Sequence, residues 1–174
     1  MENKPRQIVV IAHDIRSTHN VGSLLRTADG IGVFKVYITG YTPYPLVPHD
    51  TRLPHISTKL AKQINKTALG AETLVPWEHN PDILSLVRTL KTNGYQIVAL
   101  EQTIDSISLP AYKAPEKVAL LLGREVEGID PELLKLCDTA LEIPMFGQKE
   151  SFNVVQAAAM ALYQLRFWGI DGPA

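Results

Sequence analysis

Short apolar runs alternate along the chain with longer stretches in which apolar residues recur every three or four positions. Continuous apolar, β-branched runs are typical of strands buried on both faces of a parallel sheet, whereas the longer period is typical of amphipathic helices. The runs predicted to be strands are residues 8–12, 35–39, 72–77, 96–101, 118–123 and 139–143. The stretches predicted to be helices are 17–30, 57–68, 81–92, 131–136 and 153–168.

Strands and helices alternate throughout, which predicts an α/β fold: a mostly parallel sheet with helices on both faces. Ligands of such sheets bind beyond the carboxyl ends of the strands. The loops that follow His13, Leu100, Gly123 and Ile143 are therefore the candidate places for chemistry.

Composition sets the class of protein. The 174 residues are 45% hydrophobic and 20% charged, as expected for one globular domain that spans residues 1–174. A net charge of −1 argues against a generally basic nucleic-acid coat but leaves room for a local basic patch. The single cysteine, Cys137, excludes an internal disulfide. With no apolar signal core in residues 1–7 and no membrane-length apolar run, we expect a cytoplasmic protein.

Common nucleotide and metal motifs are absent from the sequence. There is no G-x-G-x-x-G after the first strand, no G-x-x-x-x-G-K-[ST] and no G-x-S-x-G. The five histidines form no i, i+4 pair on a predicted helix, so no metal site is expected. An ordinary dinucleotide enzyme, a P-loop nucleotidase and a serine hydrolase are thus disfavoured.

Three loop segments at strand ends remain. In the first, Asn20, Ser23 and Arg26 recur every third position on one side of a helix, and arginine is a rigid donor fork for phosphate. In the second, Gly123 would let a ligand approach the strand end, and Glu125 would accept from a ligand or from Arg26. The simpler alternatives are a helix cap, a solvated arginine and a plain strand-to-helix loop.

The third segment, residues 141–154, combines a strand end, a flexible loop and the start of an alanine-rich helix. Ser151 and Asn153 bracket that start, and both residue types are preferred helix caps. Small residues on several faces let another backbone approach closely. The helix is expected to be buried in the core or to lie at an interface.

Together the three segments resemble the signature motifs of the SpoU–TrmH family of RNA ribose 2'-O-methyltransferases, in the SPOUT superfamily. The motifs read Asn20-Val21-Gly22 with Arg26-Thr27-Ala28; Leu122-Gly123-Arg124-Glu125 with Gly128; and Ile143-Pro144-Met145 with Gly147 and Ser151-Phe152-Asn153-Val154. Their order and spacing agree with the family, and the resemblance covers essentially the whole chain. Arg124 stands where the family often has Asn or Pro, and Phe152 where it often has Leu or Met.

The resemblance implies a C-terminal deep trefoil knot, which the alternation of strands and helices alone does not suggest. It also implies S-adenosylmethionine as cofactor, bound in the knot, and a homodimer formed through the knot region, with Arg26 reaching the site of the other subunit. The positions that would contact the cofactor are Leu100, Glu101, Gln102, Gly123, Ile143, Met145, Ser151 and Asn153.

By the same resemblance, the reaction is methyl transfer to a ribose 2'-hydroxyl, and Arg26 is the catalytic arginine. Arginine stays protonated in proteins, so a plain general-base role is disfavoured. Either Arg26 holds an RNA phosphate and stabilises developing alkoxide charge, or a bound phosphate relays the proton. The residues expected to carry catalysis are Arg26, Asn20, Ser151, Asn153 and Glu125.

Binding of RNA requires positively charged side chains that contact its phosphates. Three lysines recur on one side of the predicted helix 57–68, Arg52 lies just before that helix, and Arg16 lies near the predicted helix 17–30. Alternatively, the lysines form an ordinary solvated helix face. The expected RNA-binding residues are Arg16, Arg52, Lys59, Lys62 and Lys66. Tyr41 and Tyr44 are candidates for stacking on an unpaired base.

Two functions remain after this reasoning. The first is an RNA 2'-O-methyltransferase, with transfer RNA favoured over ribosomal RNA because the chain lacks the extra N-terminal domain of larger family members. The second is a catalytically inactive dimeric RNA-binding protein on the same fold. The intact set of candidate catalytic residues favours the first.

Overall fold

A computed structural model describes residues 5–167 and shows a seven-stranded sheet in which every neighbouring pair is parallel. The strand order is β3-β2-β1-β6-β4-β7-β5. The strands are β1 (Gln7–His13), β2 (Lys35–Thr39), β3 (Trp77–His79), β4 (Gln96–Leu100), β5 (Ile107–Ser108), β6 (Lys117–Leu122) and β7 (Thr139–Glu142). The predicted α/β class with a parallel sheet is confirmed.

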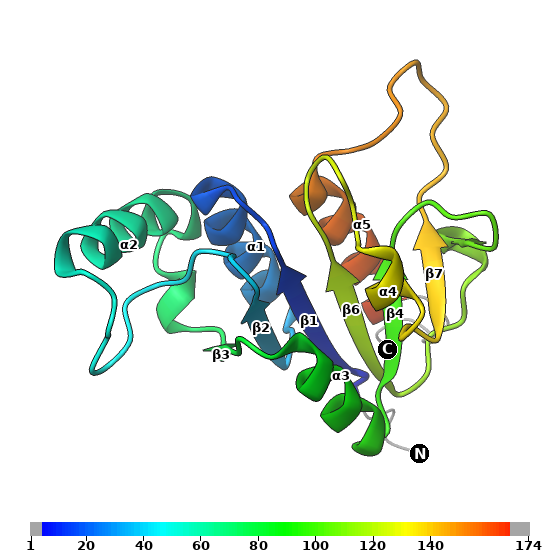
Figure 1. Ribbon diagram of the computed structural model, residues 1–174. Coiled ribbons are helices and arrows are strands. Elements are labelled where there is room, and N and C mark those ends of the chain that lie inside the picture. Colours follow the sequence, from blue (N-terminus) through cyan, green and yellow to red (C-terminus); the bar gives the residue numbers. More distant parts are fainter. Residues whose placement is uncertain (1–4, 168–174) are drawn as a thin grey trace.

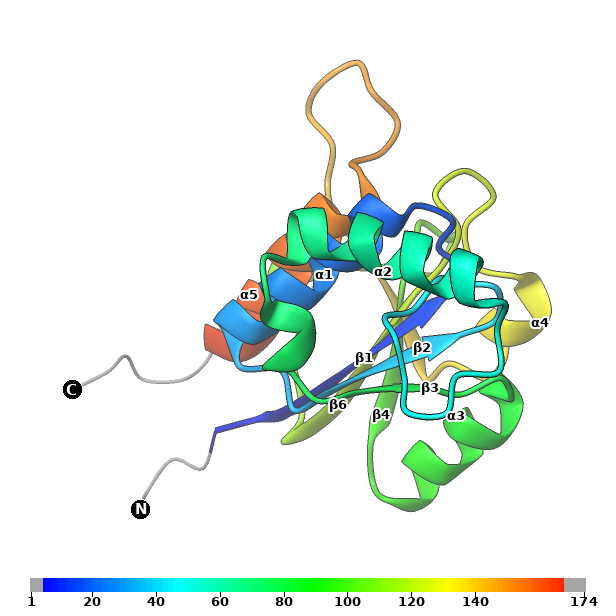
Figure 2. The same ribbon diagram turned by 90° about the vertical axis from the view of Figure 1, so that its left-hand side faces the viewer.

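Helices cover both faces of this sheet (Figures 1 and 2). They are α1 (Thr18–Ile31), α2 (Pro54–Ala68), α3 (Ile83–Thr92), α4 (Pro131–Leu134) and α5 (Val154–Phe167), with short 3₁₀ turns η1 (Ala71–Thr73) and η2 (Leu109–Ala111). Helices α1 and α5 pack on one face, with α2 against α1, whereas α3 and α4 lie on the other. The predicted end of the last helix at Trp168 lies outside the described residues.

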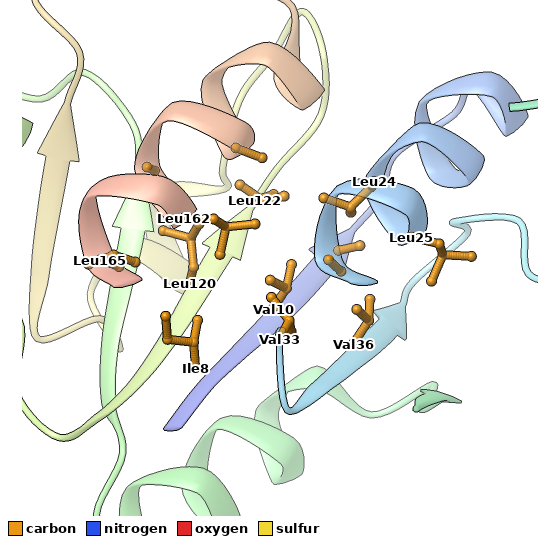
Figure 3. Close-up of a cluster of buried hydrophobic side chains, with 14 of the residues drawn as sticks. Ile8, Val10, Leu24, Leu25, Val33, Val36, Leu120, Leu122, Leu162 and Leu165 are labelled. Carbon is orange, nitrogen blue, oxygen red and sulfur yellow. The ribbon is translucent and has the colours of Figure 1, made fainter. Parts of the chain in front are cut away.

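The core follows directly from the alternation of side chains along buried strands. On β1, Ile8 and Val10 face α1 and α5, where Leu24 and Leu162 meet them (Figure 3). The intervening residues of β1 face α3 instead. An uninterrupted apolar run is therefore required, because both faces of β1 are covered.

Helix α1 shows how local sequence sets an element's bounds. The Ser17 hydroxyl accepts from the backbone N–H of Asn20, which is a side-chain N-cap. At the other end Gly32 adopts φ +71°, the left-handed conformation that ends many helices. Gly22 lies where α2 crosses α1, and a Cβ there would overlap the Ile64 carbonyl and the Thr67 hydroxyl.

Two predicted elements and the predicted start of one helix differ from the structure. The strand expected at 72–77 is a 3₁₀ turn followed by β3, which begins only after Pro76, a residue with no N–H to donate. The loop expected after Glu101 contains β5 and η2, which are too short to show a hydrophobic period. Helix α2 also begins three residues early, at Pro54, because proline suits the first helical position.

The strand order brings distant loops together. Strands β6, β4 and β7 are neighbours, and β1 lies beside β6, so the loops that follow these four strands meet at one edge of the sheet. No helix in residues 5–167 is long and apolar enough to cross a membrane.

Candidate active site

A pocket of about 200 Å³ opens beyond the carboxyl ends of β4, β6 and β7. Seven of the eight predicted cofactor-binding residues line it: Leu100, Glu101, Gln102, Gly123, Ile143, Met145 and Ser151. Asn153 does not line it. Further lining residues were not predicted as cofactor contacts, although some of them belong to the motifs: Leu122, Val126, Glu127, Leu141, Glu142, Phe152, Val154 and Ala157.

The loop between β6 and α4 folds back on itself to form one wall of the pocket. Arg124 and Gly128 exchange two backbone hydrogen bonds of 3.2 Å each. The Glu101 carboxylate accepts from the Ile129 amide at 2.9 Å and so fixes the loop to the end of β4. A Cβ on Gly123 would lie 2.6 Å from Cγ1 of Ile129. The glycine therefore makes room for the loop's own residues, and it also lines the pocket, where the sequence predicted the approach of a ligand.

Glu125, on this same loop, joins it to the start of α1. Its carboxylate accepts from the Asn20 side-chain amide at 3.0 Å and from the backbone amides of Arg16 and Ser17 at 3.2 Å each. Burial raises the pKa of Glu125, but these hydrogen bonds and one from its own backbone outweigh burial, so the pKa lies below its ordinary value. The group is an anion at neutral pH.

Asn153 brings the third motif to the same place. Its Oδ1 accepts from the Val155 amide at 2.9 Å and caps α5. Its Nδ2 donates to Oδ1 of Asn20 at 3.3 Å. The structure thus unites Asn20, Glu125 and Asn153 in one chain of hydrogen bonds, beside the pocket that Ser151 lines.

Arg26 stands apart from this chain. It lies on the exposed side of α1, and within residues 5–167 no hydrogen bond or ion pair engages its guanidinium. It does not line the pocket. The single chain therefore leaves this donor fork open to solvent.

The predicted RNA-binding residues fall into three groups. Arg16, before α1, is exposed, and its guanidinium lies 3.0 Å from Glu127. Lys59, Lys62 and Lys66 are exposed and line a shallow groove on α2 together with His55. Within the described part of the chain these lysines have no ion-pair partner.

Arg52 is different, because its guanidinium holds the loop that precedes α2. It donates to the Tyr44 and Pro45 carbonyls at 2.9 Å each and to Asp50. This hydrogen bond from Arg52 lowers the pKa of Asp50. The prediction that Arg52 binds phosphate is not supported by this geometry, because these internal contacts engage it.

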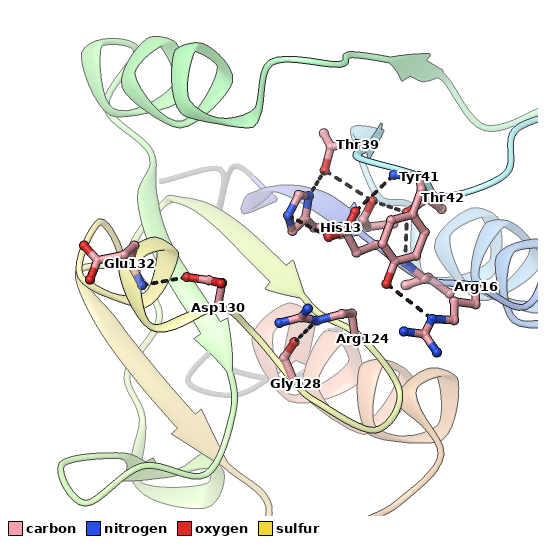
Figure 4. A network of polar contacts seen from close by, with 12 residues as sticks. His13, Arg16, Thr39, Tyr41, Thr42, Arg124, Gly128, Asp130 and Glu132 are labelled. Carbon is pink, nitrogen blue, oxygen red and sulfur yellow. Dashed lines mark hydrogen bonds and ion pairs between the residues drawn. The ribbon is translucent and has the colours of Figure 1, made fainter.

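A polar network at the ends of β1 and β2 was not foreseen (Figure 4). His13 Nδ1 lies 2.9 Å from the Thr39 hydroxyl and its Nε2 lies 3.4 Å from Asp14. Burial lowers the pKa of His13, against the opposing effect of Asp14. The Thr42 hydroxyl bridges the Ala12 carbonyl and the Ile15 amide. These contacts fix the two loops to each other.

Comparison with known proteins agrees with this picture. A curated tRNA (guanosine(18)-2'-O)-methyltransferase of Aquifex aeolicus is 26% identical over 164 residues, covering 94% of this chain and 71% of that protein. A 23S rRNA (guanosine-2'-O-)-methyltransferase of Neisseria meningitidis is 31% identical over 159 residues, covering 91% of this chain but 58% of that protein.

Solved structures share the fold. The SpoU methyltransferase AviRb of Streptomyces viridochromogenes, in complex with AdoMet, superposes with a TM-score of 0.78 at 20% identity, over 98% of this chain and 60% of that chain. A structure described as giving insights into the 2-OH methylation of C/U34 on tRNA superposes with a TM-score of 0.74 at 20% identity, over 92% of this chain and 95% of that one.

The parallel sheet, the pocket at its carboxyl edge and these likenesses define a class, the RNA methyltransferases built on this α/β fold. Within that class the chain belongs to the SpoU rRNA Methylase family, whose model matches residues 7–163.

Proposed function

We propose that this protein transfers a methyl group from S-adenosylmethionine to the ribose 2'-hydroxyl of an RNA, with transfer RNA as the favoured substrate. The observation that carries the proposal is the meeting of Asn20, Glu125 and Asn153 beside the pocket at the ends of β4, β6 and β7. The Aquifex relative's transfer RNA activity supports the choice of substrate. The Neisseria relative's activity makes ribosomal RNA the second candidate.

The pocket suits the proposed cofactor. Apolar side chains of Leu100, Leu141 and Ile143 can enclose an adenine ring, and backbone groups at the strand ends can form hydrogen bonds with the polar edge of that ring. S-adenosylmethionine supplies an electrophilic methyl group on sulfur. Ser151 lines the same pocket, and we propose that its hydroxyl orients the ribose hydroxyl.

Arg26 is proposed as the catalytic arginine. Its unengaged guanidinium can hold an RNA phosphate and stabilise negative charge as the 2'-hydroxyl loses its proton. Because Arg26 does not line the pocket of its own chain, we propose that it acts at the pocket of a second subunit.

A homodimer is proposed through the outer face of α5. There an apolar groove of about 570 Å³ is lined by Pro110, Phe146, Met160 and Tyr163. Phe146 is 99% exposed and Tyr163 is 61% exposed, which is costly for large apolar side chains in water. Nε2 of Gln164, at the same groove, is buried without a hydrogen-bond partner among the described residues. A second copy would cover the face and offer that partner.

The C-terminal trefoil knot is likewise proposed. Strand β7 lies between β4 and β5, and α5 then returns across the sheet to pack against α1, β4 and β6. The chain passes from β5 to β6 before it forms β7 and α5. A later crossing of the sheet by α5 is the kind of path that a knot requires. The groove of Lys59, Lys62 and Lys66 is proposed to face RNA phosphates.

The experiment that tests this function starts with calorimetry of S-adenosylmethionine binding, with the molecular mass in solution measured on the same sample. Radioactive methyl transfer is then measured on unmodified transfer RNA and ribosomal RNA transcripts. A 2'-O-methyl group blocks alkaline cleavage of the adjoining phosphodiester, so resistant labelled dinucleotides identify ribose as the acceptor. We expect micromolar binding to a dimer and label in transfer RNA.

Other outcomes separate the alternatives. Label confined to ribosomal RNA would establish the second substrate. A folded dimer that binds RNA but neither binds cofactor nor transfers methyl, even with RNA present, would refute the enzyme and leave an inactive RNA-binding protein.

A further inference from the structure

An exposed aromatic ring stands at the carboxyl edge of the sheet. Tyr41 follows β2 and is 51% exposed. The other exposed aromatic residue next to β2, Phe34, precedes the strand at the opposite edge and is 55% exposed. The two have similar exposure, but only Tyr41 lies at the edge where the pocket opens.

The backbone at Tyr41 is firmly held. Its amide donates to Oδ1 of Asp14 at 3.0 Å. Asp14 itself has φ +56°, a conformation that few residues other than glycine adopt. At Gly40, with φ +64°, a Cβ would overlap the Asp14 carboxylate. Asp14, in a strained backbone conformation, and Gly40, where no side chain fits, together fix the backbone position from which the Tyr41 ring projects.

The ring is also linked to the wall of the pocket. Its hydroxyl accepts from Nε of Arg16 at 3.4 Å (Figure 4), and Nη2 of Arg16 lies 3.0 Å from Glu127, which lines the pocket. The guanidinium carbon lies 5.9 Å from the ring centroid. Arg16 thus lies between the Tyr41 ring and the wall of the pocket, and the Arg16 side chain is largely exposed.

The neighbouring tyrosine offers no such surface. Tyr44 has the Arg52 guanidinium 3.6 Å from its ring centroid and the His79 ring stacked at 4.0 Å. Two groups so close to one ring must lie on opposite faces, so both faces are covered. The stacking role that the sequence allowed for either tyrosine therefore falls to Tyr41.

We propose that Tyr41, positioned by Asp14 and Arg16, is a stacking platform for an unpaired nucleobase of the RNA substrate. Every base presents a π-face, so the platform selects single-stranded RNA over duplex and not one sequence over another. The positive charge of Arg16 favours the phosphate that adjoins the stacked base. The inference rests on the proposed RNA methyltransferase function and deepens it by naming how the substrate strand is held.

The test compares two fluorescent RNA probes, a hairpin with a single-stranded loop and a blunt duplex of the same stem. Dissociation constants are measured by anisotropy for the unaltered protein, Tyr41→Ala, Tyr41→Phe and the matched control Phe34→Ala. We expect Tyr41→Ala to weaken hairpin binding about tenfold and to leave duplex binding unchanged. Tyr41→Phe keeps the ring and Phe34→Ala removes an equally exposed ring at the other edge, so both should bind the hairpin as the unaltered protein does.

Each contrary outcome is distinguishable. Equal losses on hairpin and duplex, or a loss of S-adenosylmethionine binding in Tyr41→Ala, would show a structural role and overturn the platform. Unchanged hairpin binding by Tyr41→Ala, in a protein that still methylates RNA, would overturn the platform alone. If the unaltered protein bound neither probe and methylated no RNA, the proposed function would fail and the platform with it.

Discussion

The side-chain amide of Asn20 donates to the carboxylate of Glu125 at 3.0 Å, although 105 positions separate the two residues. The same carboxylate accepts from two backbone amides that precede α1. Replacing Glu125 by Gln keeps the shape but leaves only one oxygen to accept. We expect Glu125→Gln to lower the free energy of unfolding by about 1 kcal/mol at pH 7, measured by urea denaturation, and to reduce methyl transfer.

This effect depends on pH in a defined direction. Because the folded-state pKa of Glu125 lies below its ordinary value of 4.5, its contribution to stability is present above that value. It is lost as the pH falls through the lower pKa of the folded protein. The stability difference between the unaltered protein and Glu125→Gln should therefore shrink below about pH 4. A difference that stays constant down to pH 3 would show that the charge is not responsible.

Gly22 and Gly30 lie on the same helix and provide a matched pair. A Cβ on Gly22 would overlap α2, whereas a Cβ on Gly30 meets nothing within 4 Å. Gly22→Ala should force the helices apart and cost about 1–3 kcal/mol of unfolding free energy. Gly30→Ala should stabilise the protein by about 0.5–1 kcal/mol, because alanine is the better helix former. Equal thermal midpoints for the two variants would contradict the close crossing.

Arg26 has no internal partner in residues 5–167, so its replacement should separate catalysis from stability. We expect Arg26→Ala to change the unfolding free energy by less than about 0.5 kcal/mol and to lower methyl transfer by about 10²–10³-fold. Arg26→Lys keeps the charge but loses the fork, and should also be impaired. Arg88 is exposed on α3, so Arg88→Ala serves as the control and should retain activity. Full activity of Arg26→Lys would rule out the fork as the essential feature.

The lysine groove on α2 predicts a salt effect. Each phosphate contact adds about 0.7–0.9 to the slope of log affinity against log salt concentration. Lys59→Gln with Lys62→Gln should reduce the slope for RNA binding by about 1.5, whereas Lys113→Gln with Lys117→Gln, near the start of β6, should not. An unchanged slope in the first double variant would mean that the lysines form an ordinary solvated face.

The apolar face of α5 predicts a change of mass. Met160→Glu would place a charge in the groove and should convert the dimer into a monomer, as measured by sedimentation equilibrium. Leu84→Glu, on the exposed side of α3, serves as the control and should leave the mass unchanged. If Arg26 acts across the interface, the monomeric Met160→Glu variant should also lose methyl transfer. A monomeric unaltered protein would refute the interface outright.

The sequence reveals the elements whose signals are local. The start of α1 was expected near residue 17, and the Ser17 hydroxyl caps the helix there, a role that the sequence had left open for Asn20. The long apolar run of β1 predicted a strand covered on both faces. The loops around the pocket were expected because carboxyl ends of parallel strands share one edge, whereas the individual cofactor positions followed from the family resemblance.

What the sequence conceals depends on contacts between distant segments. The placement of β7 between β4 and β5 leaves no periodic trace, because strand order is decided by packing over the whole chain. Arginine is a residue type that often binds phosphate, yet the guanidinium of Arg52 donates hydrogen bonds to carbonyls of the loop before α2. The network at His13 was missed because one of its partners, Thr39, lies on a different strand.

The order of strands also bears on how the chain is made. Strands β1 and β2 leave the ribosome early, but β6, β4 and β7, whose ends form the pocket, are complete only when the chain has reached Glu142. Asn153 then joins Asn20 across 133 positions. Contacts of such long separation form late and slowly. A nascent chain that ends before β7 would thus lack one wall of the pocket, and cofactor binding is expected only after that strand and the segment that follows it have been made.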